Sequence, residues 1–260
     1  VNTGAGIPGT INVNTGDDDD LLTVNLADGV TTTINLDGGA PSASDHVTIN
    51  GTAGADVLVI DGPTVTLGNT AVSLTGIEHL TVNGGGGNDD ISATGTVVST
   101  SLTINGQAED DTVTLTAPIS TGTLTVNGDS GTANALIVRT TENADDVTLD
   151  ASQVQIFGST TADYAGFATL DIETLGGQDN LAINVTSGMP ETVNVSTGSE
   201  DDSMTVNLAE GVTTSINLDG GEPSASDHVT VNGTAGPDTI AVSGSTVTSA
   251  GVTVSLTAVE

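Results

Sequence analysis

The sequence predicts an all-β fold, a parallel β-solenoid, and three observations carry this prediction. The chain repeats itself at a fixed interval, short alternating segments recur along it, and its 260 residues hold no Trp, one Tyr and two Phe. A solenoid stacks short coils so that equivalent residues form rows, and a thin core of aliphatic side chains suits it. Helix is expected to be nearly absent, because no stretch keeps a 3.6-residue period.

The longest repeat is a duplication. "DHVTINGTAGAD", which starts at Asp45, returns as "DHVTVNGTAGPD", which starts at Asp227. At about half that distance, "GIEHLTVNGGGGNDDI" from Gly76 aligns with "GFATLDIETLGGQDNL" from Gly166. We therefore expect one continuous solenoid over residues 1–260, built from units at 1–91, 92–182 and a truncated 183–260.

A shorter interval lies inside each unit. An acidic or Asn residue immediately precedes an x-aliphatic pair at Asp20, Asp45, Asp89, Asp111, Asn134, Asp179, Asp202 and Asp227. Most neighbours in this series are almost equally spaced, and two intervals are about twice as long as the rest. This spacing predicts about 23 residues per coil and about eleven coils. Further acidic turns follow a member of the series by about half a coil and are expected on the opposite side of the same coil: Asp56, Asp145 and Asp238.

The segments between the acidic turns have strand chemistry. "LTVN", "VTIN", "LTIN" and "TINL" alternate aliphatic residues with Thr or Asn, and "ADG", "AEG" and "DGP" between them are typical of turns. The alternative fold is a string of tandem β-sandwich domains of about 91 residues, as in cadherin-like or immunoglobulin-like arrays. Such cores normally contain a Trp or Tyr, and the short interval runs through the boundaries that these domains would need.

Charge narrows the classes of partner. The chain has 34 Asp and Glu against one Lys or Arg, so its net charge of −33 excludes nucleic acid and anionic membrane surfaces as partners and favours cations. No apolar run of about 18 residues predicts membrane insertion, and no signal peptide is recognisable. A chain that starts at Val1 is expected to be processed or to be part of a longer one.

Enzymatic activity has no supporting constellation in the sequence. Arg139 is the one basic residue besides histidine. His46 and His228 are copies of one repeat position and His79 stands apart, so no histidine is paired with a carboxylate by a recognisable motif. We expect a protein that is not an enzyme.

One turn carries a specific motif. "GGGGNDDIS", residues 84–92, fits G-G-x-G-x-D-x-U-x, and here the chain resembles the repeats-in-toxin (haemolysin-type) calcium-binding family and the repetitive β-solenoid proteins of bacterial cell surfaces. Other turns keep the aspartate but replace the late glycine with Asp18, Glu109 or Glu200. The resemblance implies several bound Ca²⁺ ions, since glycines let carbonyl oxygens converge and aspartate supplies a hard anionic oxygen. The candidate metal ligands are Asp20, Asp45, Asp56, Asp89, Asp111, Asp145, Asp179, Asp202, Asp227, Asp238, Asp18, Asp19, Asp90, Asp110 and Asp201.

Electrostatics gives an independent reason to expect a cation. Carboxylates stacked about 5 Å apart repel each other by roughly 3 kcal/mol per pair at an effective dielectric of about 20. A row of such pairs would cost as much as the whole stability of a domain. Either a divalent ion bridges them, or water and salt screen a solvated acidic edge.

These observations together predict a structural role. We expect a secreted, extracellular, calcium-stabilised segment of a cell-surface layer, appendage or filament, which stacks end to end with copies of itself or continues in a longer chain. The alternative is an adhesin stalk or a ligand-binding module, including an ice-binding one built on the recurring Thr-x-Asn. A ligand site would need an interruption of the repeat, for which residues 150–170, with Phe157, Tyr164 and Phe167 in or beside them, are the candidate. The Thr-x-Asn positions are more simply explained by strand preference and by Asn side chains that bond to their copies in adjacent coils.

Overall fold

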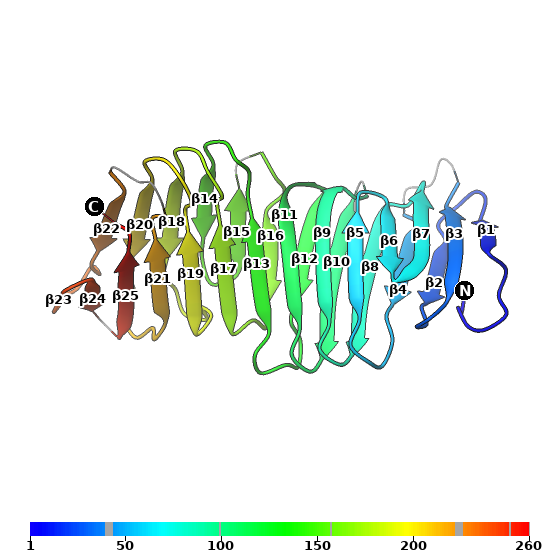
Figure 1. Ribbon diagram of the computed structural model, residues 1–260, viewed down its shortest axis with the longest axis horizontal. Coiled ribbons are helices and arrows are strands. Elements are labelled where there is room, and N and C mark those ends of the chain that lie inside the picture. Colours follow the sequence, from blue (N-terminus) through cyan, green and yellow to red (C-terminus); the bar gives the residue numbers. More distant parts are fainter. Residues whose placement is uncertain (40–43, 99, 157, 222–225, 250, 260) are drawn as a thin grey trace.

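The computed structural model describes residues 1–39, 44–98, 100–156, 158–221, 226–249 and 251–259. This part of the chain forms 25 β-strands and no helix. Figure 1 shows the strands side by side along one long axis, with the N-terminal end at the right and the C-terminal end at the left. The all-β class is confirmed, and the two long, mostly parallel sheets are compatible with a β-solenoid.

Each sheet runs through most of the chain. In spatial order, the 14-strand sheet consists of β1 (Thr10–Asn14), β3 (Thr31–Asp37), β7 (Asn69–Thr75), β6 (Thr64–Leu67), β5 (Val57–Asp61), β9 (Asp90–Thr96), β11 (Thr112–Ser120), β13 (Ala135–Arg139), β17 (Thr169–Glu173), β19 (Thr192–Ser196), β21 (Ser215–Asp219), β25 (Val252–Thr257), β24 (Thr246–Ser249) and β23 (Ala241–Ser243). The 11-strand sheet consists of β2 (Leu21–Asn25), β4 (His46–Asn50), β8 (His79–Gly86), β10 (Ser101–Ala108), β12 (Thr123–Asn127), β16 (Ala162–Ala165), β15 (Gln153–Ile156), β14 (Asp146–Leu149), β18 (Asn180–Asn184), β20 (Ser203–Asn207) and β22 (His228–Asn232).

Parallel pairing brings like residues side by side. Thr103 pairs with Thr125 and Asn105 with Asn127, with side-chain partners 22 residues apart. The same registration joins β1 to β3 and β18 to β20 at a separation of 23 residues. Pairing also crosses the expected unit boundaries, because β9 contacts both β5 and β11, and β18 contacts both β14 and β20.

The core lies between the sheets and follows the alternation read from the sequence. Most strands turn every second side chain inward, as in β2, where Leu22 and Val24 are buried between exposed neighbours. The buried set is almost wholly Val, Ile, Leu and Ala, and one contiguous cluster runs along the molecule. Thin coils of small side chains therefore share a single elongated core.

Three antiparallel meanders interrupt the parallel sheets. They are β5–β6–β7, β14–β15–β16 and β23–β24–β25, one in each unit of the repeat. Gly62, Gly68 and Gly244 supply the left-handed backbone at their tight turns. The first and third meanders lie in the 14-strand sheet and the second lies in the 11-strand sheet. The two extra strands that each meander adds are therefore shared between the two sheets.

The meanders explain the long intervals in the acidic series. The sequence interval from Asp45 to Asp89 was expected to hold two plain coils, but it contains a meander instead. Strands on either side of a meander are related by larger offsets, such as the 33 residues that separate Asn50 from its partner Asn83. An antiparallel hairpin and a coil share the same period of two, so the sequence pattern could not tell them apart.

Candidate functional site

The acidic turns place a row of aspartates inside the protein. Each one directly precedes a strand, or ends the turn before it, and its side chain points inward between adjacent coils. The described members that are at most 9% exposed are Asp45, Asp56, Asp89, Asp111, Asp145, Asp179, Asp202 and Asp227, with Asn134 at the same kind of position. The sequence had suggested either a solvated edge or an ion-bridged row, and burial of these side chains contradicts the solvated edge at these positions.

Hydrogen bonds join these side chains into columns. The backbone N–H of Asp89 donates to Oδ1 of Asp111 at 2.9 Å, and the N–H of Asp111 donates to Oδ1 of Asn134 at 2.8 Å. The same bond, between 2.8 and 2.9 Å long, joins Asp179 to Asp202 and Asp202 to Asp227. One carboxylate oxygen of each residue is thereby occupied by a buried main-chain donor that would otherwise be unsatisfied.

The columns number three in the described residues, and they differ from the single series expected from the sequence. They contain Asp20, Asp45 and Glu78; Asp56, Asp89, Asp111 and Asn134; and Asp145, Asp179, Asp202 and Asp227. Asp56 thus stacks on Asp89, and Asp145 on Asp179. Because a meander shifts the chain between one acidic turn and the next, the residue that follows in the series is not always the one that stacks above.

The second carboxylate oxygen divides the aspartates into two kinds. In Asp56, Asp145 and Asp238 a threonine four residues earlier caps the side chain; Thr52, for example, donates its N–H to Oδ2 and its hydroxyl to Oδ1 of Asp56. In a second set, Oδ2 is buried and makes no hydrogen bond within the described part of the chain. This set comprises Asp20, Asp89, Asp111, Asp179, Asp202 and Asp227.

Glycines make room for the buried oxygens. A β-carbon on Gly84 would collide with Oδ2 of Asp89, and one on Gly106 would collide with Oδ2 of Asp111. The same hypothetical atom on Gly84 would lie 2.7 Å from the carbonyl oxygen of Gly106. The carboxylate therefore sits against the main chain of two neighbouring coils, and only glycine leaves that space.

Asn134 shows what this position requires. Its Oδ1 accepts the N–H of Asp111, as an aspartate does, while its Nδ2 donates to the carbonyl oxygens of Gly128 at 2.7 Å and Gly166 at 3.0 Å. The atom that replaces Oδ2 is thus a donor that faces two acceptors. The sequence analysis grouped Asn134 with the aspartates by spacing, but only the fold reveals this difference in chemistry.

Burial changes the acidity of these groups. Loss of solvent around Asp89 and Asp179 raises the pKa of each carboxyl from 3.8 to about 6, with a further rise from the neighbouring carboxylates of the column. The pKa of Asp111 and of Asp202 is raised for the same main reason. Asp110, beside Asp111 in sequence, behaves oppositely: the N–H groups of Ala133 and Thr132 hold its pKa below 3.8.

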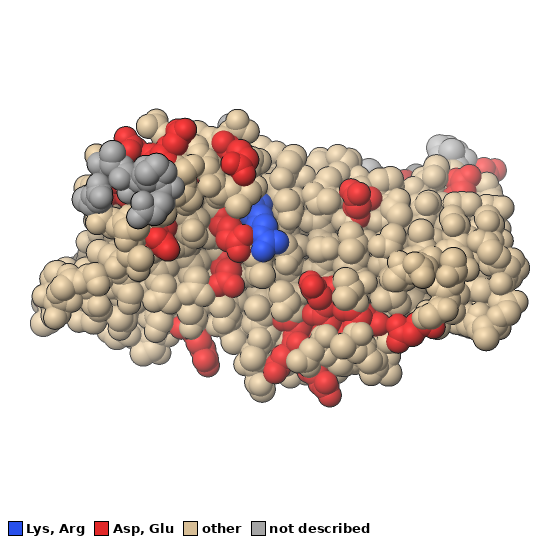
Figure 2. Space-filling model, in the orientation of Figure 1, with Lys and Arg blue, Asp and Glu red and all other residues tan. Residues whose placement is uncertain are grey.

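Other candidate ligands lie toward solvent. Asp18, Asp19, Asp90 and Asp201 are exposed, as is Asp238, and Asp110 is half-buried. Figure 2 shows acidic side chains gathered mainly near the two long edges of the face in view. Among the described residues, no three His, Cys, Asp or Glu side chains come close enough together to hold a metal ion.

The buried columns offer a calcium ion few side-chain ligands. Calcium takes six to eight oxygen ligands, among them carboxylate, backbone carbonyl and water oxygens, and each column position offers one free carboxylate oxygen, because Oδ1 already accepts an N–H from the adjacent coil. At the equivalent position Asn134 turns hydrogen-bond donors toward the carbonyls, where a cation would be repelled. Calcium binding by this chain stays a prediction from the resemblance.

The asparagines, two of the histidines and Arg139 make contacts within the protein that link neighbouring strands. The asparagine ladder expected from the sequence is confirmed, with Asn50 donating to Asn25, and Asn83 to Asn50, at 2.7 Å. The rings of His46 and His79 stack at 4.1 Å, a contact that their spacing in sequence did not reveal. Arg139 pairs with Glu173 at 2.6 Å.

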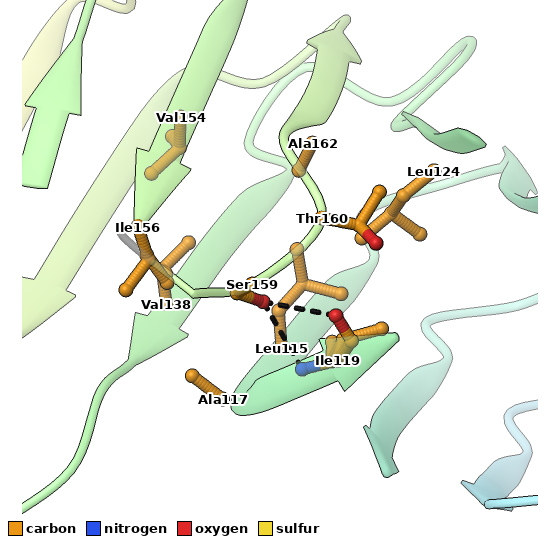
Figure 3. Close-up of a pocket in the computed structure, with 10 residues that line it drawn as sticks. All are labelled: Leu115, Ala117, Ile119, Leu124, Val138, Val154, Ile156, Ser159, Thr160 and Ala162. Atoms are coloured by element: carbon orange, nitrogen blue, oxygen red, sulfur yellow. Dashed lines mark hydrogen bonds between the residues drawn. The ribbon is translucent and has the colours of Figure 1, made fainter. Parts of the chain in front are cut away.

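The region considered for ligand binding is filled by a meander. Tyr164 and Phe167 are buried, and the Tyr164 hydroxyl donates to the carbonyl of Asp150, while Phe157 lies outside the described residues. A nearby cavity of about 10 Å³ is lined mainly by apolar side chains (Figure 3). Within it, the Ser159 hydroxyl bonds to both the N–H and the carbonyl of Ile119. The cavity has room for about one water molecule and for no larger ligand.

Comparison with known proteins adds no relative: no family, curated protein or solved structure matches the chain. In the described residues, no helix has the length and apolar character needed to cross a membrane.

Proposed function

We propose that this chain is a non-enzymatic structural rod, a β-solenoid of about 23 residues per coil and about eleven coils that serves in an extracellular surface layer, appendage or filament. The observation that carries the proposal is the parallel pairing, often of like residues, that recurs along both sheets between the meanders. The buried acidic turns join one coil to the next through a main-chain N–H that donates to a carboxylate oxygen. Such an arrangement resists bending and separation of coils, which is what a rod has to do.

The side chains that could support catalysis are engaged with each other. His46 stacks on His79, and Arg139, the one Lys or Arg of the sequence, is paired with Glu173. Of the hollows that residues 150–170 line, the apolar one of about 10 Å³ is too small for a substrate, and the other, of about 420 Å³, is an open surface hollow beside Gln153, Gln155 and Asp163. These contacts favour a structural role over an enzyme, and the adhesin alternative would have to use the open surface hollow beside Gln153, Gln155 and Asp163.

The proposed partner is a second copy of the same fold, placed end to end. Each end of a stack of parallel strands presents main-chain donors and acceptors in the geometry that another coil matches. The strong negative charge would keep rods apart sideways while leaving the ends as the surface for association.

Electron microscopy of the purified chain over a range of concentrations tests this proposal. Fourteen strands at about 4.8 Å spacing give a rod on the order of 65 Å long, and we expect longer fibres of the same width as the concentration rises. Rods that stay single at every concentration would remove the end-to-end partner, and a compact particle would remove the rod. The same samples, treated with chelator and followed by circular dichroism, test calcium: an unchanged β spectrum would remove the prediction of a calcium-stabilised fold, and loss of the spectrum would support it.

A further inference from the structure

Every Asn–Gly step in the sequence lies on the asparagine ladder. In each step the asparagine side chain donates to an asparagine of the preceding coil. Such a step is chemically labile, because glycine has no β-carbon and lets its main-chain nitrogen approach the preceding side chain. The steps are Asn50–Gly51, Asn83–Gly84, Asn105–Gly106, Asn127–Gly128 and Asn232–Gly233.

The reaction open to an Asn–Gly step is deamidation, in which the chain attacks itself. The glycine nitrogen loses its proton to base in the solvent and attacks Cγ of the asparagine, the Cγ–Nδ2 bond breaks, and ammonia leaves. Water then opens the cyclic imide at either carbonyl and gives aspartate or isoaspartate, so the net reaction consumes water and releases ammonia. It requires a glycine N–H that is free to lose its proton and an asparagine side chain that is free to turn.

The first copy of the duplicated segment restrains both groups. The N–H of Gly51 donates to the carbonyl oxygen of Asn83 at 2.8 Å. Nδ2 of Asn83 donates to Oδ1 of Asn50 at 2.7 Å, while Asn50 itself donates to Asn25. The nitrogen that would attack and the carboxamide that would be attacked are therefore both held by the next coil.

The second copy has the same local structure around its Asn–Gly step. Residues 50–54 and 232–236 both read NGTAG. Thr52 and Thr234 each cap the aspartate four residues later with their N–H and their hydroxyl. A difference in reactivity between the two copies must then come from the coil above.

That coil is missing above Asn232 in the part of the chain that the structure describes. Asn232 still donates to Asn207 at 2.8 Å. Among the described residues, however, neither the N–H of Gly233 nor Oδ1 of Asn232 takes part in a hydrogen bond, and both residues are exposed. Two of the restraints that hold the first copy are thus absent.

We propose that Asn232–Gly233 is a site of self-modification, which deamidates to aspartate or isoaspartate, and that a covering coil protects Asn50–Gly51 from the same reaction. The modification replaces the Nδ2 donor by a carboxylate oxygen, so the bond to Asn207 is lost and a negative charge is added at the uncovered end of the ladder. An uncovered coil therefore ages chemically while a covered one does not. The inference rests on the ladder and does not depend on the proposed function.

Asn127 separates the two restraints. The N–H of Gly128 donates to the carbonyl oxygen of Ala165 at 2.8 Å, as Gly51 does to Asn83. The residue that pairs with Asn127 on β16 is the same Ala165, which has no side-chain amide to donate. Asn127 should therefore deamidate more slowly than Asn232 and faster than Asn50.

Peptide mapping by mass spectrometry tests the proposal. The 260-residue chain is kept folded in mildly alkaline buffer at low concentration, sampled over time and cut with pepsin, because its single Lys or Arg leaves trypsin almost no site. We expect deamidation at Asn232 to be faster than at Asn50 by about tenfold or more, since two hydrogen bonds oppose it in the first copy alone. In urea the two rates should become equal, because the local sequences are identical.

A substitution in the ladder tests protection apart from the end of the molecule. Asn83→Ala removes the amide that donates to Asn50 and keeps the main-chain carbonyl that accepts from Gly51. We expect it to raise the rate at Asn50 to that of Asn127. Thr81→Ala, on the same strand and the same face but outside the ladder, is the matched control and should leave the rate unchanged.

Three results would overturn the inference. The first is an equal rate at Asn50 and Asn232 in the folded chain. The second is an Asn232 that stays intact while the urea-unfolded chain reacts at both steps, and the third is a rate at Asn50 that Asn83→Ala does not change. None of them bears on the rod proposal, which microscopy tests separately.

Discussion

The two copies of the duplicated segment, near residues 15–78 and 197–260, have almost the same sequence but different surroundings. In the first copy Leu58 and Ile60 on β5 are fully buried. Their counterparts in the second copy, Ile240 and Val242, are 48% and 70% exposed. The strands β4 and β5 are covered by β8 and β9, whereas in the described part of the chain no further strand pairs with β22 beyond β20 or with β23 beyond β24.

The difference teaches that a coil gains much of its burial from its neighbour. Equivalent residues are buried in the first copy and exposed in the second. The stability of one repeat therefore depends on the coil that packs next to it. Positions whose neighbours are present in both copies should therefore respond alike to mutation, and positions that depend on the next coil should not. The substitutions below test this division, and all are compared in the same 260-residue chain.

The largest effect is expected at a glycine that both copies surround in the same way. Gly39 and Gly221 each have a left-handed backbone, and a β-carbon on either would collide with the carbonyl oxygen of the preceding coil, that of Gly16 or Gly198. Gly39→Ala and Gly221→Ala should each cost about 3 kcal/mol or more, from left-handed strain and overpacking together. Urea unfolding measures both.

The glycine pair has its own control. Gly29→Ala has a comparable positive φ but meets no atom within 4 Å of the added carbon, so it should cost only the smaller strain term. If Gly39→Ala and Gly221→Ala differ by more than this control costs, the two copies are not equivalent even where their surroundings match.

An intermediate and unequal effect is expected in the apolar core. Ile60→Ala removes a fully buried side chain from β5, the strand that pairs with β9, and should cost about 2–5 kcal/mol. Val242→Ala, at the same repeat position, should change the free energy of unfolding by about 0.5 kcal/mol or less, since most of that side chain is already in water. Equal losses would mean that something covers β23 in solution, which end-to-end association would provide, and dilution would then separate the two values.

Much of the architecture was predictable because it repeats a local rule. Alternation in segments such as Leu21–Asn25 predicted the strands, and identical residues at equal spacing predicted the asparagine ladder. These features depend on a period of two and on the stacking of like with like, both of which are visible in a single sequence. The scarcity of aromatic residues correctly indicated a thin core.

The features that the sequence did not predict depend on which residues contact each other between adjacent coils. The meanders share their alternation with the coils, so the stacking of Asp56 on Asp89, in place of Asp45, could not be read from spacing. Similarly, Asp111 and Asn134 occupy equal places in the series, but one has a buried oxygen and the other a donor toward two carbonyls. Adjacent Asp110 and Asp111 differ as much, because one lies outside the column and the other within it.

A smaller loss than that at Ile60 is expected from the asparagine ladder, where the two copies can be compared at the level of single hydrogen bonds. Asn50 donates to Asn25 and accepts from Asn83, whereas Asn232 donates to Asn207 and, in the described residues, accepts from no asparagine above it. Asn50→Ala should therefore cost about 1–3 kcal/mol for two bonds, and Asn232→Ala about half of that. Urea unfolding of both variants beside Asn50→Asp, which keeps the acceptor and loses the donor, separates the two bonds. A ladder whose central and terminal members cost the same would show that each asparagine stabilises its own turn and does not join neighbouring coils.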